Sequence, residues 1–272
     1  MERFFPDIKY VSFLPLAGTQ ITDNYIPYTA RKYDIVFTGN YTPPHTFDKY
    51  INRIDDDYSL FYHNIIDNLI NNPDKTIEEA IEYQTRAEIN DLTEEDLKNA
   101  MASMIFIDLY VRFHFRALAV QTLVDNGFRV DVFGKGWDLL ECRNKSNLII
   151  HGGIESQECI LNMLDSRISL NVMPWFKAGA HDRIFNTMLS KSVSLSDGST
   201  YITDQFNEGK EIVLYSLSSM DKLPKIAGDL LSDPDKAAGI AEAGYQKSRI
   251  LHSWKNRAEA LSEYINRVWF WI

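Results

Sequence analysis

The sequence has few cysteines, no long hydrophobic run and no excess of positive charge, and each absence excludes a class of protein. Its 272 residues include two cysteines, Cys142 and Cys159, too few for a disulfide framework and without the spacing of metal ligands. No segment approaches the ~20 apolar residues of a membrane span, and the first residues lack the basic region and apolar core of a signal peptide. These absences predict a cytoplasmic protein with reduced thiols and no membrane span.

Positive charge is scarce relative to negative charge. The chain has 28 lysines and arginines against 38 acidic residues, which gives a formal net charge of −10. A long contact with the phosphate backbone of a nucleic acid is therefore not expected, although a single nucleotide is not excluded as a ligand. The hydrophobic content of 45% is enough for one large core or two smaller ones.

Familiar nucleotide and metal motifs are missing as well. There is no G-x-x-x-x-G-K-[ST] loop, and Gly134-Lys135-Gly136 lacks the third glycine and the downstream acid of a dinucleotide fingerprint. A G-x-S-x-G nucleophile elbow is absent too. The run Asp55–Asp57 is the nearest approach to a metal site, but adjacent carboxylates do not converge on one cation. We interpret it as a solvated acidic turn and expect no metal and no cofactor.

What the sequence does have is an alternation of apolar strands and amphipathic helices. Strands are predicted at 34–39, 129–133, 148–151, 168–173, 193–196 and 211–215, with helices at 157–164, 183–190, 221–231, 234–252 and from Trp254 onwards. This order predicts an α/β fold, a Rossmann-like parallel sheet with helices on both faces and ligands at the carboxyl ends of the strands.

The pattern also divides the chain into parts. The Rossmann-like domain is predicted at 34–44 and 105–272, and residues 1–33 form a leading segment or linker. Polar helical segments between them predict an inserted helical subdomain at 45–104, with the helix start at Thr93.

The strongest candidate site lies between Val172 and Asp197. A strand ends there, a loop follows that cannot continue it, and a helix opens at Asp182. The N-terminus of such a helix offers unpaired N–H groups and partial positive charge, and the side chains of His181 and Arg183 suit a diphosphate. A surface capping role for either residue stays open.

Other candidate contacts follow two of the predicted strands. Gly39 and Asn40 come after strand 34–39, where a phosphate could touch them. Gly152 and Gly153 come after strand 148–151, where the absence of side chains lets a flat base approach the backbone, and Glu155 could assist. A simple tight turn explains the two glycines equally well.

Several fragments, in this order and spacing, resemble the CgeB-like group of bacterial glycosyltransferases. The fragments are FLPLAG, DIVFTGNY, VFGKGW, HDRIFNTMLSKSVSLSDGSTYITDQFNEGKEIVLYSL and GYQKSRILHSWKNRAEAL. Together they span most of the chain outside the helical insertion. The resemblance is to the C-terminal, donor-binding half of GT-B glycosyltransferases. It implies a nucleotide-diphosphate sugar as ligand, with a UDP-sugar favoured and no metal needed.

The resemblance also implies roles for particular residues. Arg183 and His181 would hold the donor diphosphate near Gly39 and Asn40. Asn186 falls where related E-x7-E enzymes carry a second glutamate that binds ribose, and an asparagine can still bind a diol.

The same resemblance covers the stretch after the next strand. Asp197, Ser199 and Tyr201 match a D-x-S-x-Y pattern of the group, which implies contact with the sugar or positioning of the loop, while a turn or capping role stays open. Ala178 stands in place of the first glutamate of the E-x7-E pair, so a retaining mechanism is not inherited.

GT-B enzymes usually take the acceptor, and in inverting members the catalytic base, from an N-terminal domain. Few residues precede FLPLAG here, so the resemblance implies a missing acceptor domain or a partner subunit, and catalytic residues stay unassigned. Two functions remain: the donor-binding domain of a glycosyltransferase, or a non-catalytic nucleotide-sugar-binding or assembly subunit. A homo-oligomer is a further open alternative.

Overall fold

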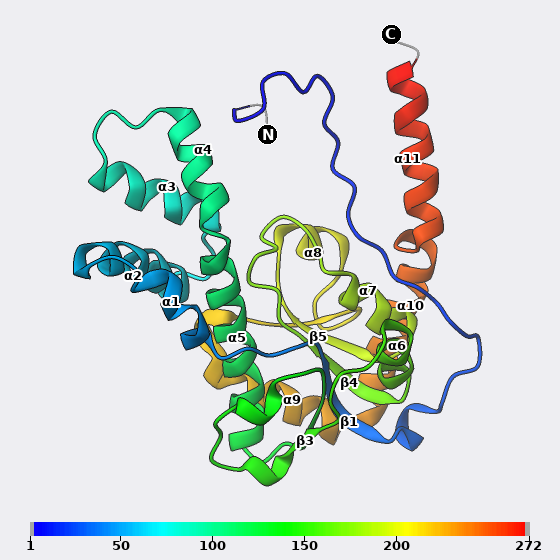
Figure 1. Cartoon of the computed structure of the whole chain (residues 1–272). Helices are drawn as coiled ribbons and strands as arrows, with labels where there is room; N and C mark the ends of the chain where they lie inside the picture. Colours follow the sequence, from blue (N-terminus) through cyan, green and yellow to red (C-terminus); the bar gives the residue numbers. More distant parts are fainter. Residues whose placement is uncertain (1–2, 270–272) are drawn as a thin grey trace. The chain divides into compact units, whose positions relative to one another are not determined.

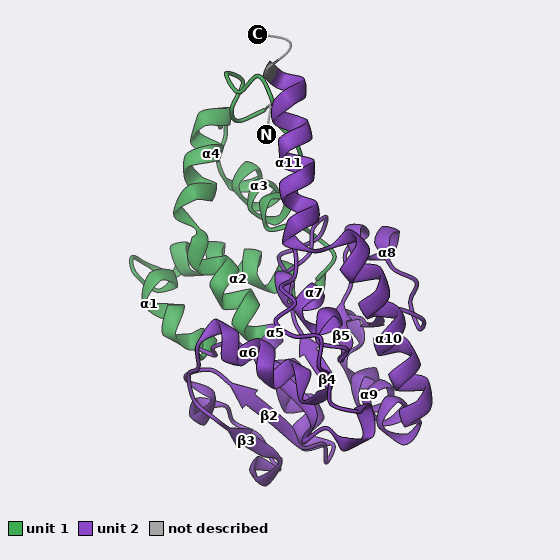
Figure 2. Ribbon diagram, turned by 90° about the vertical axis from the view of Figure 1, so that its right-hand side faces the viewer, with its two compact units in different colours: residues 1–13, 43–114 green, residues 14–42, 115–272 purple. Residues whose placement is uncertain are grey.

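The computed structural model describes residues 3–269. The first two residues of the predicted segment 1–33 and the last three residues of the predicted domain at 105–272 lie outside the described residues. The chain forms two compact units (Figure 2). Unit 1 contains residues 1–13 and 43–114, and unit 2 contains residues 14–42 and 115–272. Unit 1 therefore includes residues 1–13 and 105–114, which the sequence pattern assigns to the leading segment and to the Rossmann-like domain.

Unit 2 is built on a six-stranded parallel sheet (Figure 1). Its strands are β1 (Tyr33–Thr38), β2 (Val130–Phe133), β3 (Leu148–Ile150), β4 (Ser166–Asn171), β5 (Val193–Asp197) and β6 (Val213–Tyr215), in the order β3-β2-β1-β4-β5-β6. Each predicted strand is present, with ends that differ by at most two residues. The predicted parallel α/β sheet is thus confirmed.

Helices cover both faces of this sheet, which explains why β2 and β5 are buried along their whole length. The helices of unit 2 are α6 (Ser156–Leu164), α7 (Asp182–Leu189), α8 (Thr200–Gln205), α9 (Leu223–Ser232), α10 (Pro234–Leu251), the second half of α5 (Ile105–Asp125) and α11 (Trp254–Trp269), which extends away from the sheet (Figure 1). The sequence pattern did not predict α8, a short helix capped by the Ser199 side chain, which accepts the Ile202 N–H. No helix in the described part of the chain could span a membrane.

The start of α11 is joined to the segment that leads into the sheet. The Arg257 guanidinium donates hydrogen bonds to the carbonyls of Pro15 (2.9 Å), Leu16 and Leu251. The Gly18 N–H donates to the His252 carbonyl at 2.9 Å. Unit 2 is therefore closed by contacts between residues more than two hundred positions apart in the chain.

Unit 1 is helical, which confirms the expected helical subdomain. It contains α1 (Asp48–Ile51), α2 (Asp56–Asn71), α3 (Ile77–Glu88), α4 (Glu94–Ser103) and the first half of α5. The Asp55 carboxylate caps α2 by accepting the Tyr58 N–H at 2.8 Å. The acidic run is thus the N-cap and first turn of a helix rather than the solvated turn predicted from the sequence.

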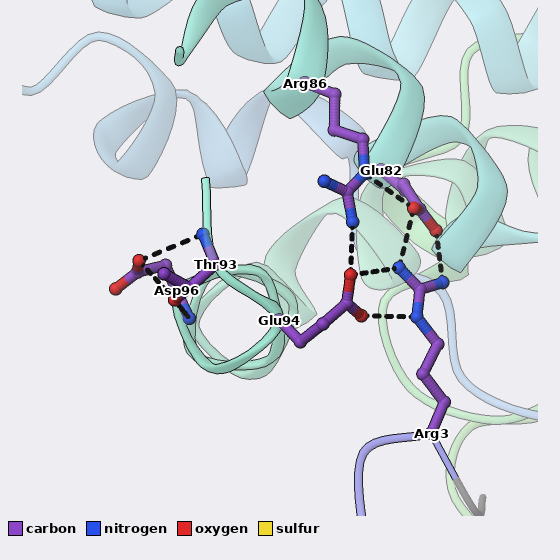
Figure 3. A network of polar contacts seen from close by, with 6 residues as sticks. All are labelled: Arg3, Glu82, Arg86, Thr93, Glu94 and Asp96. Carbon is purple, nitrogen blue, oxygen red and sulfur yellow. Dashed lines mark hydrogen bonds and ion pairs between the residues drawn. The ribbon is translucent and has the colours of Figure 1, made fainter. Parts of the chain in front are cut away.

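Capping boxes at Thr76 and Thr93 begin α3 and α4, and the predicted helix start at Thr93 is confirmed. Figure 3 shows the Thr93 box with Asp96 and, beside it, ion pairs that join Arg3 and Arg86 to Glu82 and Glu94. Exposed ion pairs contribute little stability, so this network fixes the position of the first residues more than it holds the unit together.

Candidate functional site

The strand order reverses between β1 and β4, and in folds of this kind ligands bind outside the carboxyl ends of the strands at that point. Gly39 and Asn40 follow β1 at this edge, and the segment 172–181 follows β4. Arg183 enters the same region from the first turn of α7. The structure thus brings together three of the residues predicted to contact a diphosphate.

Arg183 is the central side chain of this edge. It is 7% exposed, and its Nη1 donates a hydrogen bond of 2.6 Å to Oδ1 of Asn171, the last residue of β4. The guanidinium carbon lies 5.4 Å from the centre of the Phe37 ring. A Cβ atom built on Gly39 would lie 3.4 Å from Nη2, so the Gly39 backbone passes close to the guanidinium.

The charge of Arg183 is poorly compensated. Among residues 3–269, no carboxylate lies within the 4.0 Å ion-pair distance of its guanidinium. Burial lowers the pKa of Arg183, and the carboxyls of Asp182 and Asp197 act on it only from greater distance. A buried guanidinium with one neutral partner is costly, and an anion bound beside it would remove much of that cost.

His181 is the N-cap residue of α7. Its Nδ1 accepts the Arg183 N–H at 3.2 Å and also lies 2.6 Å from Oδ1 of Asp182. These two contacts are alternatives, because one nitrogen cannot accept from an amide and donate to a carboxylate at once, and the tautomer decides between them. Burial and the nearby Arg183 charge lower the pKa of His181, which keeps the ring neutral at pH 7. The capping role is thus present, and a diphosphate contact stays a prediction.

The two asparagines of the predicted site are already engaged within the protein. Asn40 accepts the Lys135 N–H at 2.9 Å through Oδ1, and its carbonyl accepts from Arg116 at 3.0 Å. Asn186 accepts the Thr19 N–H at 2.8 Å through Oδ1. Its Nδ2 donates to Oδ2 of Asp182 at 3.3 Å, so a ribose hydroxyl would have to use the second N–H of Nδ2 or share Oδ1 with Thr19.

Asp197 and Ser199 hold the loop that follows β4. The Asp197 carboxylate accepts the Met173 N–H at 2.7 Å, and the Ser199 hydroxyl donates to the Gly179 carbonyl at 2.5 Å. These bonds fit the loop-positioning alternative for both residues. Asp197 is 4% exposed, and burial raises its pKa from 3.8 to about 7.

Tyr201, the third residue of the D-x-S-x-Y pattern, contacts a different neighbour. Its hydroxyl lies 3.5 Å from Nδ1 of His252, the residue that ends α10. The structure therefore places Tyr201 beside the junction of α10 and α11. The sugar contact stays a prediction for this residue.

Gly152, Gly153 and Glu155 lie after β3, two strands along the sheet from β1. Gly152 has a positive φ of 75°, and its carbonyl accepts the Gly134 N–H at 2.7 Å. Glu155 is the N-cap residue of α6 and is exposed. The tight turn is therefore real, and contact of these residues with a base stays a prediction.

Sequence reasoning missed Asn171 and Tyr215. Asn171 orients Arg183 and donates from Nδ2 to Oγ of Ser196 at 2.8 Å, while the Tyr215 hydroxyl donates to the Asn171 carbonyl at 2.8 Å. The available signal was an asparagine that closes an apolar strand, because a buried polar side chain needs partners. Among the described residues, no group of three or more His, Cys, Asp or Glu side chains could hold a metal ion.

A parallel sheet with an uncompensated arginine at its switch point defines a protein of the α/β class with a candidate anion site. A family model described as glycosyl transferase-like matches residues 112–263, which is more than half of the chain. The chain therefore belongs to this glycosyl transferase-like family. The matched region contains Arg183, Asn186 and Asp197, while Gly39 and Asn40 precede it. No curated protein matches the chain in sequence.

Three solved structures illustrate what the fold is similar to. Sucrose-phosphate synthase from Thermosynechococcus elongatus is 11% identical over 58% of this chain and 44% of its own, with a TM-score of 0.49. S. aureus TarM, in complex with UDP, is 16% identical over 57% and 32%, with a TM-score of 0.45. Anabaena HepE, in complex with UDP-glucose, is 10% identical over 87% and 100%, with a TM-score of 0.46. The chain spans less than half the length of the first two.

Proposed function

We propose that this chain binds the diphosphate of a nucleotide sugar, as the donor-binding part of a GT-B glycosyltransferase of the CgeB-like group. The observation that carries the proposal is Arg183. Its buried guanidinium has no carboxylate partner among the described residues, lies at the switch point of the sheet and belongs to the region matched by the family. These features favour an anionic ligand at this position.

The local geometry suggests how the diphosphate would be held. Asn171 takes one N–H group of Arg183, which fixes the plane of the guanidinium and leaves further N–H groups for phosphate oxygens. At Gly39 no side chain adds bulk beside Nη2. Arg183 and the N-terminus of α7 would then balance the negative charge without a metal ion.

This arrangement also suggests a role in transfer. When the bond between the sugar and the diphosphate breaks, negative charge grows on the departing nucleoside diphosphate. A fixed cation stabilises that charge more strongly in the transition state than in the bound donor, and this difference accelerates the reaction. In this proposal UDP is the nucleotide, Asn186 contacts the ribose and the glycines after β3 receive the base.

Calorimetric titration with UDP, GDP, ADP and their sugars, with and without Mg²⁺, tests the proposal. We expect one nucleotide family to bind without Mg²⁺ and Arg183→Met to weaken that binding by about tenfold or more, because a charged hydrogen bond contributes about 1.5–3 kcal/mol. Arg167→Met is the matched control, since Arg167 lies at the start of β4, at the end of that strand opposite Asn171, and pairs with Asp34.

The thermal unfolding midpoint of each variant shows whether it is folded. A folded Arg183→Met variant with unchanged affinity would remove Arg183 from the site, and the absence of binding by every nucleotide would overturn the proposal. Binding without hydrolysis or transfer, even with an acceptor domain supplied, would favour the non-catalytic alternative.

A further inference from the structure

Unit 1 contains a cavity of about 340 Å³ that none of the residues discussed above as donor contacts lines. Its walls come from α1, α2, the turn between them, the end of α4 and the start of α5, all within the helical unit (green in Figure 2). The volume lies at the lower end of the ~300–1,000 Å³ typical of small-molecule sites. The cavity is therefore large enough for one small organic molecule.

Aromatic rings form most of the wall. Tyr50 stacks on Phe106 with ring centres 5.7 Å apart and an interplanar angle of 26°. Tyr62 meets Phe106 edge-on at 5.0 Å, and Tyr58 meets Tyr62 edge-on at 4.8 Å. Tyr62 and Phe106 are buried, whereas Tyr50 is 43% exposed. The fixed inner rings and the accessible outer ring together offer a flat apolar surface to a ligand.

A cationic side chain also lies beside these aromatic rings. Arg53 lines the cavity from the turn between α1 and α2, and its guanidinium carbon lies 5.6 Å from the centre of the Tyr58 ring. Within residues 3–269, no carboxylate lies within 4.0 Å of the Arg53 guanidinium. Arg53 is thus an exposed cation, in a strongly acidic protein, whose charge is not used by an ion pair.

We propose that this cavity binds a small organic anion that carries a six-membered ring with an apolar face. The ring packs against Tyr50 and its aromatic neighbours, and the negative group reaches the Arg53 guanidinium. An arginine stacked on an aromatic face keeps its N–H groups at the edge of the plane, where they can meet a carboxylate or a phosphate. Two sources supply this chemistry: an acidic sugar and an aromatic acid.

The assignment does not rest on the proposed donor site, because no residue is shared and the ligands differ. Four probes separate the two sources and isolate the charge: glucuronate with glucose as its neutral counterpart, and 4-hydroxybenzoate with phenol. Binding is measured by ligand-observed NMR titration on the full chain. We expect at least one acid to bind and its neutral counterpart to bind about tenfold more weakly or worse.

Arg53→Gln should reduce binding of the acid to the level of the neutral probe. Lys49→Gln is the matched control, because Lys49 lies over the Tyr50 ring at 4.9 Å but does not line the cavity. Ser103→Trp fills the cavity at an exposed lining position and should abolish binding of both probes. Circular dichroism confirms that each variant keeps its helices.

The outcomes are distinct. Binding of glucuronate alone assigns the cavity to acidic sugars, and binding of 4-hydroxybenzoate alone assigns it to aromatic acids. Failure of both acids to bind, equal binding of an acid and its neutral counterpart, or full binding by the Arg53→Gln variant would each overturn the proposal.

Discussion

Replacing Asp197 with asparagine should change how the stability of this protein depends on pH. Asp197 closes β5 and is almost fully buried, and burial raises its pKa from 3.8 to about 7. The Met173 N–H, Lys177 and Arg183 lower that pKa in turn, but the cost of burying the charge is larger. The folded protein therefore keeps this carboxyl protonated in a range where the unfolded chain has lost the proton.

The sign and size of this pH effect on stability follow from the difference between the folded and unfolded pKa values of Asp197. Because the folded pKa is the higher one, the stabilisation is complete below about pH 4 and is lost as the pH rises through 7. At 1.36 kcal/mol per pKa unit, the full loss is about 4 kcal/mol, and the part that falls between pH 5 and pH 7 is about 2 kcal/mol. Asp197→Asn removes this dependence while its Oδ1 can still accept the Met173 N–H.

Urea unfolding from about pH 5 to about pH 8.5 measures the effect. As the pH rises across this range, we expect the free energy of unfolding of the wild type to fall by about 3 kcal/mol relative to that of the variant. Asp229→Asn is the control, since it removes the same charge from an exposed position. Parallel pH profiles for Asp197→Asn and wild type would refute the reasoning and would mean that Arg183 and Lys177 keep the buried carboxylate ionised.

Four further substitutions test the packing and one helix cap by urea unfolding. Gly134→Ala should lower the free energy of unfolding by more than about 3 kcal/mol, because its Cβ would lie 2.1 Å from a backbone oxygen. Gly127→Ala, also at positive φ but with open space around its Cβ, should lower it by about 1–2 kcal/mol. Equal losses would contradict the predicted clash at Gly134. Arg257→Met should lower the free energy of unfolding by about 2–4 kcal/mol, because the carbonyls of residues 15 and 16 lose their hydrogen-bond donor. An unchanged free energy of unfolding would mean that Arg257 does not hold this segment in place. Thr93→Ala should lower the free energy of unfolding by about 1 kcal/mol, because α4 loses the cap shown in Figure 3. An unchanged urea midpoint would disprove this prediction.

Local patterns predicted most of the elements of unit 2 and the start of α4 in unit 1. Apolar runs such as 168–173 are long and bounded by turn residues, so they identify buried strands, and helix starts such as Thr93 carry a capping signature. The exception is α8, six residues of mixed polarity whose helix depends on the Ser199 cap. Too short for a periodic pattern, it gave no signal that distinguished it from a loop.

The candidate site could be predicted only in part. Arg183 at the first turn of a helix and Gly39 after a strand follow from sequence patterns, and both lie at the switch point. That Asn186 is held by Thr19 could not be read from the sequence, because the two are 167 residues apart. The residues predicted to receive a base lie after β3, and nothing in their local sequence says how far along the sheet they stand from Arg183.

The sequence by itself determined the alternation of strands and helices, the parallel α/β class and the placement of Arg183 at a helix start, because neighbours in the chain encode these features. Only the tertiary structure decided that Gly39, Asn171 and Arg183 meet, that Arg183 has no carboxylate partner among the described residues and that Asp197 binds its proton so tightly. The sheet order brings distant residues together, and burial is a property of the whole environment of a group, which no local pattern contains.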